Sequence, residues 1–448
     1  MIKKNRKLVS FCTYIFVLLP ILGTYGFFSK SITFADIAII ITLIAVLMDS
    51  IISRKLKISN KAFFLFVIWC VFSTILASAI YPGLFSKITL IQIIKLLIYS
   101  TAIIIIPTRY FDFELAKKVY TRVGIVLSII VFIQYSIYLI NGSFYPWVIN
   151  SKYFPAIYVN DDYFSGAYLY MLGGSTFRPA SIFSEPALFA QFISPCLILN
   201  MFSEDNKKKY LILILITLAT FLGKSANGIV YIVVIWISFI LIKMYLALKN
   251  KKFKLKTSLV FLIFILFLLS PILIPKMSNL LFGNEKYSII NRISEIKDVK
   301  GETSGSMRII RGWQIYNKMS FKEKITGIGI GNILNYLDIH PYTVTMFSKS
   351  YNGYMSGLSA IFVNFGLIGG LIFLWWLLKQ FASKSKVSKS LSIFLLLYLI
   401  ASNSFLSPQF VITIILVITT FDLEKKINNK TPTNNSVIQN TITYERSN

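Results

Sequence analysis

Long apolar runs constrain the fold of this chain more than any other feature of its sequence. A helix needs about 20 apolar residues to cross the hydrocarbon core of a membrane, and few other backbone structures are tolerated there. Twelve such runs, two of them short, occupy residues 8–28, 32–52, 62–81, 88–106, 119–140, 187–202, 210–222, 228–246, 258–275, 354–378, 391–406 and 410–421. The sequence therefore predicts an all-α polytopic membrane protein with about 12 transmembrane helices in one domain, residues 1–421.

Composition excludes a soluble protein. The chain is 56% hydrophobic and only 14% charged, whereas soluble domains carry about 25% charged residues. The net charge of +28 would suggest nucleic acid binding in a soluble chain, but here the basic residues cluster between apolar runs. Cys12, Cys70 and Cys196 all lie inside apolar runs without metal-ligand spacing. We therefore predict neither a nucleic acid partner nor a metal site.

Clusters of lysine and arginine predict the orientation in the membrane. They follow every second apolar run, at residues 54–61, 109–122, 207–209, 249–256 and 379–389. Because such clusters favour the cytoplasmic side, both termini are predicted to be cytoplasmic, and the polar tail 422–448 is predicted to be disordered there. The same orientation predicts two large extracytoplasmic loops, residues 141–185 and 276–353.

The first predicted outer loop ends in the stretch GSTFRPASIFSEPALFAQF, from Gly174 to Phe192. It places Arg178 and Glu185 seven residues apart, each directly followed by proline, where an apolar run begins. Arg178 is a candidate for binding phosphate, and Glu185 could cap the next helix or act as a general base. Many aromatic residues precede this stretch, and they suit either a sugar-binding surface or a belt at the membrane interface.

The second predicted outer loop carries further candidates. Arg308 and Arg311 are three residues apart and would share one helical face, with Arg292 before them; their guanidinium groups suit phosphate or anionic lipid. The sequence GIGIGN that begins at Gly327 lacks a surrounding βαβ unit, so it predicts a tight turn and not a nucleotide site. His340, the one histidine of the chain, could be a base, a hydrogen-bond donor or a structural residue.

Two lysines stand in or beside apolar runs. Lys95 lies inside the run 88–106, and Lys224 lies in LGKSANG, the turn between two runs. Because charge inside a membrane is costly, a function is the default hypothesis for both, although Lys224 could simply extend outward to water. Asp36 and Asp49 lie near the ends of the run 32–52 and are weaker candidates.

These features resemble a known family. The stretches FRPASIFSEPALFA, GKSANG and SYNGYMSGLSAIFVNFGLIGGLIF, with twelve predicted helices and two outer loops, are similar to the Wzy-type O-antigen and capsular polysaccharide polymerases and to the related O-antigen ligases. The resemblance implies a glycosyltransferase of the bacterial inner (plasma) membrane. It would transfer a growing glycan from undecaprenyl pyrophosphate to a lipid-linked repeat unit on the extracytoplasmic face.

The resemblance also implies partners. The substrates would be undecaprenyl-pyrophosphate-linked oligosaccharides within membrane lipid, with no cofactor and no metal. A chain-length regulator and a flippase are the candidate protein partners. The pathway served would be O-antigen (lipopolysaccharide) or capsule biosynthesis.

The resemblance assigns roles to individual residues. Arg178 and either Arg308 or Arg311 match the family's loop arginines, so the pyrophosphate-binding set is Arg178, Arg292, Arg308, Arg311 and Lys224. Glu185, His340 and Arg178 are the catalytic candidates, and Tyr351 and Asn352 are the acceptor-binding candidates. The spaced R-x10-G pattern of some polymerases is not reproduced. Ligases commonly have H-N where this chain has Tyr351 and Asn352, which favours a polymerase.

The alternatives are an O-antigen ligase, a polysaccharide flippase or other transporter, and a purely structural membrane protein. Transporters often contain internal repeats, and the two halves of this chain show none. Clustered charge in the outer loops favours chemistry over a structural role.

Overall fold

The computed structural model describes residues 5–27, 29–54, 60–142, 178–202, 209–249, 309–340, 355–383, 385–402 and 405–429. The predicted span 258–275 lies outside the described residues, as do most of both predicted outer loops. Four candidate site residues, Arg292, Arg308, Tyr351 and Asn352, also lie outside them.

Helices account for most of the described chain. Their bounds are α1 (Arg6–Leu22), α2 (Phe34–Ile52), α3 (Lys61–Ile80), α4 (Lys87–Arg109), α5 (Phe113–Asn141), α7 (Pro186–Met201), α8 (Lys209–Leu222), α9 (Ala226–Lys249), α14 (Arg311–Lys318), α15 (Phe321–Thr326), α16 (Ile333–Ile339), α17 (Gly357–Phe381), α18 (Lys386–Ala401) and α19 (Pro408–Asn429). A helix lies at every predicted span except 258–275. Among the described residues, six of these helices (α2, α3, α4, α5, α9 and α17) are long and apolar enough to cross a membrane.

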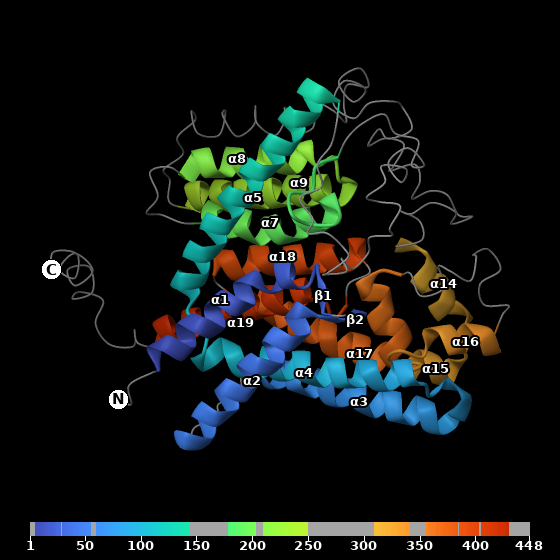
Figure 1. The fold of residues 1–448 in the computed structure, drawn as a ribbon. Helices are drawn as coiled ribbons and strands as arrows, with labels where there is room; N and C mark the ends of the chain where they lie inside the picture. The colour runs from blue at the N-terminus through green and yellow to red at the C-terminus, as the bar shows by residue number, and fades with distance from the viewer. Residues whose placement is uncertain are drawn as a thin grey trace.

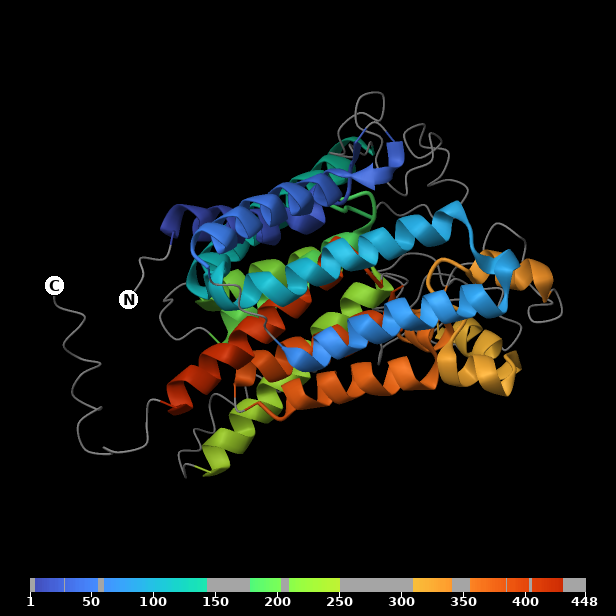
Figure 2. The same cartoon turned by 90° about the horizontal axis from the view of Figure 1, so that it is seen from below.

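The helices form a bundle with two distinct ends (Figures 1 and 2). The start of α1 and the end of α19 lie at the same end, which we call the terminal end. The short helices α14, α15 and α16 lie at the opposite end, which we call the loop end.

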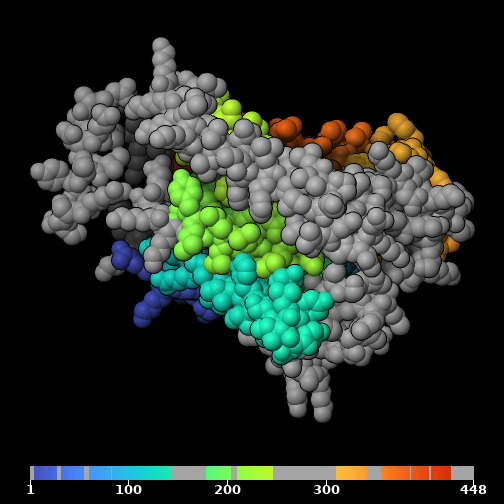
Figure 3. Space-filling model, turned by 90° about the horizontal axis from the view of Figure 1, so that it is seen from above, coloured from blue at the N-terminus to red at the C-terminus, as the bar shows by residue number. Residues whose placement is uncertain are grey.

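Burial follows the pattern expected of a bundle in lipid. The central helix α7 is buried along almost its whole length, and most of its residues are apolar, as expected of a core helix. On one face of the molecule α5 and α8 lie side by side (Figure 3). The outer helices expose large apolar side chains instead, for example Ile51 of α2 at 75% and Ile75 of α3 at 60%. An outer surface of this kind suits lipid, so the protein is a helical, multi-pass membrane protein.

The first helix is shorter than the sequence predicts. The apolar run continues to residue 28, but α1 ends at Leu22 and a small antiparallel pair follows, β1 (Gly26–Phe27) and β2 (Ser29–Thr33). The backbone turns at Gly23, where a Cβ atom would lie 2.5 Å from Pro408 Cγ. The next helix then begins with a capping box between Thr33 and Asp36, which stops it from extending backwards.

The last helix is longer than predicted. The tail was expected to be disordered from residue 422, but α19 continues to Asn429. Glu424 explains part of this extension, because it accepts hydrogen bonds from the Ser383 hydroxyl and from the Ser385 N–H, the latter at 2.9 Å. Residues 430–448 of the predicted tail lie outside the described residues.

Lys95, the charge inside an apolar run, has an acidic partner. Its Nζ lies 3.4 Å from Asp36 Oδ1, and the Tyr99 hydroxyl donates to the same carboxylate oxygen at 2.7 Å. A lysine in lipid is tolerated when it is paired. The ion pair therefore gives Lys95 a structural role, joining α4 to the start of α2.

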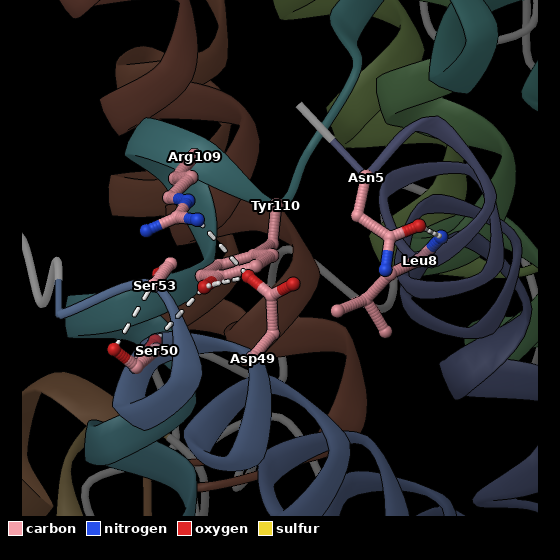
Figure 4. Close-up of polar contacts among 7 residues, drawn as sticks. All are labelled: Asn5, Leu8, Asp49, Ser50, Ser53, Arg109 and Tyr110. Carbon is pink, nitrogen blue, oxygen red and sulfur yellow. Dashed lines mark hydrogen bonds and ion pairs between the residues drawn. The ribbon is translucent and has the colours of Figure 1, made fainter. Parts of the chain in front are cut away.

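Asp49 makes a second link between α2 and α4 at the other end of these helices (Figure 4). Arg109 Nη2 lies 3.0 Å from Asp49 Oδ2, and the Tyr110 hydroxyl donates to the same oxygen at 2.8 Å. Ser50 also contacts the Tyr110 hydroxyl, at 2.8 Å. Asp36 and Asp49, the weaker candidates from the sequence, thus both serve to hold α2 against α4.

The segment Gly327–Asn332 is inserted into the bundle. Helix α17 is broken at Gly366 (φ 68°, ψ −172°), and the carbonyls before the break accept hydrogen bonds from this segment: Ile328 N–H donates to Val363 O at 3.1 Å and Gly329 N–H to Asn364 O at 2.8 Å. A broken helix within a membrane protein needs such partners for its freed carbonyls. The segment contains the predicted turn, at Ile330 and Gly331, and the residues before that turn pack against the helix break.

Candidate functional site

The segment from Arg178 to Glu185 is held firmly against its neighbours. Gln134 of α5 makes two hydrogen bonds to Ser181: its Nε2 donates to the Ser181 carbonyl and its Oε1 accepts from the Ser181 N–H, both at 2.9 Å. The Tyr25 hydroxyl donates to Ile182 O at 3.2 Å. Ser181 lies in the left-handed region, with φ 57°, so the backbone is fixed in a conformation that a free loop would rarely adopt.

The turn of the GKSANG stretch packs against this segment. A Cβ atom on Gly223 would lie 3.3 Å from Pro179 O and 3.6 Å from Pro186 Cβ. The next residue, Lys224, has φ 48°, a left-handed conformation that forms a tight connection between α8 and α9. Two stretches that the sequence singled out separately therefore meet in space.

This contact brings two cations together. Burial lowers the pKa of Lys224, and the positive charge of Arg178 lowers it further. The Lys224 ammonium lies 5.7 Å from the centre of the Tyr135 ring. In the part of the chain that the structure describes, Lys224 makes no ion pair with a carboxylate. Two neighbouring cations attract an anion more strongly than either one alone, so the pair suits an anion such as phosphate.

Glu185 stands at the other end of the same segment. It occupies the N-cap position of α7, and its backbone carbonyl accepts from the N–H groups of Leu188 at 3.1 Å and Phe189 at 3.3 Å. Its carboxylate makes no capping hydrogen bond. Glu185 therefore occupies the predicted cap position, but its side chain makes no capping hydrogen bond.

Arg311 belongs to a separate element at the loop end. It begins α14, is fully buried, and has a pKa that burial lowers to about 10, so it stays charged at neutral pH. Helix α14 packs on the start of α17, because Gly312 lies directly against Ser359. The predicted face shared by Arg308 and Arg311 cannot be described, since Arg308 lies outside the described residues.

The ring of His340 packs against Tyr336, and Tyr336 binds a buried carboxylate, Glu323, that sequence reasoning missed. The two rings lie 4.7 Å apart, and the Tyr336 hydroxyl donates to Glu323 Oε2 at 3.1 Å. Glu323 also caps α15 through a capping box with Ser320. The motif Ser320-x-x-Glu323 was the available signal, because serine followed three residues later by glutamate is typical of helix starts.

Glu323 makes the stability of the loop end depend on pH. Burial acts to raise its pKa, but hydrogen bonds from Ser320, Tyr336 and Tyr81 outweigh burial and lower it. A carboxylate whose pKa is lowered by folding stabilises the fold above its unfolded pKa and loses that contribution as the pH falls through its folded pKa. Glu323→Gln is therefore expected to flatten the fall in thermal stability of the detergent-solubilised protein below about pH 5. An unchanged acid-side slope would contradict this role.

Lys224 is expected to cost stability when no anion is bound. Lys224→Met removes one of two neighbouring cations while keeping an apolar stem of similar length, so it should raise the melting temperature of the purified protein in anion-free buffer. The same variant should lose most of the stabilisation that inorganic pyrophosphate gives the wild type, since ligand binding stabilises in proportion to affinity. A lower melting temperature in anion-free buffer would instead assign Lys224 a structural role.

The described residues contain no group of three His, Cys, Asp or Glu side chains that could hold a metal ion. Comparison with protein-family models gives no match, and comparison with curated proteins finds no similar sequence. The function of the protein has therefore to be inferred from its own residues.

Proposed function

We propose that this protein is a polysaccharide polymerase, a glycosyltransferase that moves a growing glycan from undecaprenyl pyrophosphate to a lipid-linked repeat unit. The observation that carries the proposal is the packing of the Gly223–Lys224 turn against Pro179, which brings the charge of Arg178 close enough to act on Lys224 in a bundle of apolar helices. Such a pair suits a pyrophosphate carried by a membrane lipid.

The chemistry of the transfer explains why cations are needed. The bond between the anomeric carbon of the donor and its phosphate oxygen breaks, and the electron pair leaves with the undecaprenyl pyrophosphate. Groups that stabilise charge as it develops on a leaving phosphate accelerate such a step most. The Arg178 guanidinium can bind two oxygens at once, and Lys224 adds a compact second charge.

The acceptor sugar needs a base. Its hydroxyl oxygen forms the new bond to the anomeric carbon and gives up a proton. Glu185 is the base that we propose, because its carboxylate makes no capping hydrogen bond and it belongs to the same fixed segment as Arg178. His340 is the second candidate, on α16 at the loop end.

The orientation in the membrane belongs to the same proposal. Twelve spans with both termini in the cytoplasm agree with the meeting of the start of α1 and the end of α19 at one end of the bundle. The loop end then faces outward from a bacterial inner (plasma) membrane. Lipid-linked repeat units would meet the protein there, in the service of O-antigen or capsule synthesis.

Glycan length in the host strain tests the proposal. The gene is deleted, complemented with the wild type, and the surface polysaccharide is separated on a gel. Deletion should collapse a ladder of lengths to a single repeat, and complementation should restore the ladder. Loss of single repeats as well would point to a flippase or a ligase, and a ladder that persists after deletion would refute the proposal.

A further inference from the structure

We infer that α16 lies in the lipid–water interface, with Leu334 and Ile339 in contact with outer-leaflet lipid. The choice of the outer leaflet rests on the orientation given with the proposed function, whereas the place in the interface rests on the contacts of α16. The first support is the attachment of α16 to the turn between α3 and α4: Asn335 Nδ2 donates to Leu84 O at 3.0 Å. The Ile339 side chain also lies over that turn, because a Cβ atom on Gly83 would be 3.7 Å from Ile339 Cδ1.

The turn itself lies at the edge of the apolar surface. It consists of the short helix η1 (Pro82–Leu84) and joins α3 to α4, both long and apolar enough to cross a membrane. Three exposed apolar side chains surround it: Ile80 at 52%, Phe85 at 52% and Ile88 at 50%. A turn with such neighbours belongs at the level where acyl chains meet headgroups.

The inserted segment before α16 fixes its depth independently. Ile330 N–H donates to Thr74 Oγ1 at 3.1 Å, and Thr74 lies six residues before the end of α3 at Ile80, which is about 9 Å along a helix. Asn332 Oδ1 then accepts from the Thr89 hydroxyl of the first turn of α4 at 2.6 Å. Helix α16 follows directly and has only seven residues, so it cannot reach far from the bundle.

The exposed apolar side chains of α16 indicate that lipid covers its outer face. Leu334 is 41% exposed and Ile339 is 48% exposed, and Ile339 lies over Gly83, between the exposed Ile80 and Phe85 in the chain. Asp338 is exposed as well, as suits a helix at the level where acyl chains meet headgroups and water. Contact with water alone would leave these apolar side chains unfavourably hydrated. A place in the interface also puts His340, which directly follows Ile339, at the depth of lipid phosphates.

Fluorescence quenching tests the inference in the full-length protein. Ile339→Cys, Leu334→Cys and two reference variants are labelled with bimane and reconstituted in vesicles of equal parts phosphatidylcholine and phosphatidylglycerol. Ile75→Cys on α3 is the lipid-facing reference, and Glu114→Cys, whose side chain is 71% exposed, is the aqueous reference. The native cysteines are buried, so unsubstituted protein gives the labelling background. The quenchers are a lipid with a nitroxide beside the headgroup and aqueous iodide.

Labels at residues 334 and 339 should be quenched by the nitroxide lipid as strongly as the label at residue 75. Iodide should quench them at least about threefold less than the label at residue 114, as expected for side chains in the interface. Strong quenching by iodide alone would place α16 in water and overturn the inference. Protection from both quenchers would overturn it too, because the face would then be covered by protein.

Discussion

Gly366→Ala is expected to abolish the folded protein. Gly366 has φ 68° and ψ −172°, a conformation essentially restricted to glycine, and a side chain there costs about 1–3 kcal/mol in strain alone. An added Cβ would also overlap the Ile325 carbonyl oxygen and lie 2.6 Å from Gly327 N. These neighbours are backbone atoms of the end of α15 and the start of the inserted segment, so they cannot move aside without disturbing the hydrogen bonds to Val363 and Asn364.

A second glycine provides the matched control. Gly142, which ends α5, has nearly the same φ of 64°, but nothing lies within 4 Å of the place where its Cβ would stand. Gly142→Ala should therefore cost only the strain of a left-handed residue, about 1 kcal/mol. The yield of monodisperse protein after detergent extraction measures both variants. Equal yields would show that the helix break at Gly366 is not essential to the fold.

Arg178→Ala is expected to slow glycan extension by about 100-fold or more, the usual loss when one charge-stabilising donor is removed from a reaction centre. Arg178→Lys keeps the charge but loses the two-pronged geometry, so it should recover only part of the rate. Lys224→Ala should also reduce the rate, by a smaller factor, because Arg178 remains. The ladder of surface polysaccharide, normalised to the amount of membrane-inserted protein, reports all three.

Lys87 is the control for a general effect of charge. It is an exposed lysine at the start of α4, beside the turn that contacts α16. Lys87→Ala removes one positive charge without touching the segment of Arg178, so the ladder should stay unchanged. A loss as large as that of Arg178→Ala would mean that overall positive charge matters and that the pairing of Arg178 with Lys224 does not.

The sequence predicted the helices well because apolar length is a local property. A helix lies at each predicted span within the described residues, since each run is long enough to demand one. The boundaries were harder: where α1 ends, Gly23 packs closely against Pro408, nearly 400 residues away, and no local pattern shows such a neighbour. The break in α17 was hidden for the same reason, because the run FVNFGLIGG reads as uninterrupted apolar helix and only its partner, Gly327–Asn332, explains it.

In the candidate site, too, the sequence predicted local features and missed long-range contacts. Charges at the edge of apolar runs drew attention to Arg178 and Lys224, but the prolines after Arg178 and Glu185 prevented any inference about distance. The structure shows that the turn before Lys224 packs against Pro179, so that the charge of Arg178 acts on Lys224. For Lys95 the sequence suggested a function, but its ion pair with Asp36, which depends on the packing of two helices, gives it a structural role instead.

Polymerisation by the purified protein tests the central proposal most directly. The wild type and Arg178→Ala are reconstituted separately in vesicles with undecaprenyl-pyrophosphate-linked single repeats from the host strain, without nucleotide sugars or added metal. The products are then separated by length. We expect chains of two or more repeats with the wild type and almost none with Arg178→Ala. Repeats that remain single with correctly folded, membrane-inserted wild-type protein would contradict the assignment of this chain as a polymerase.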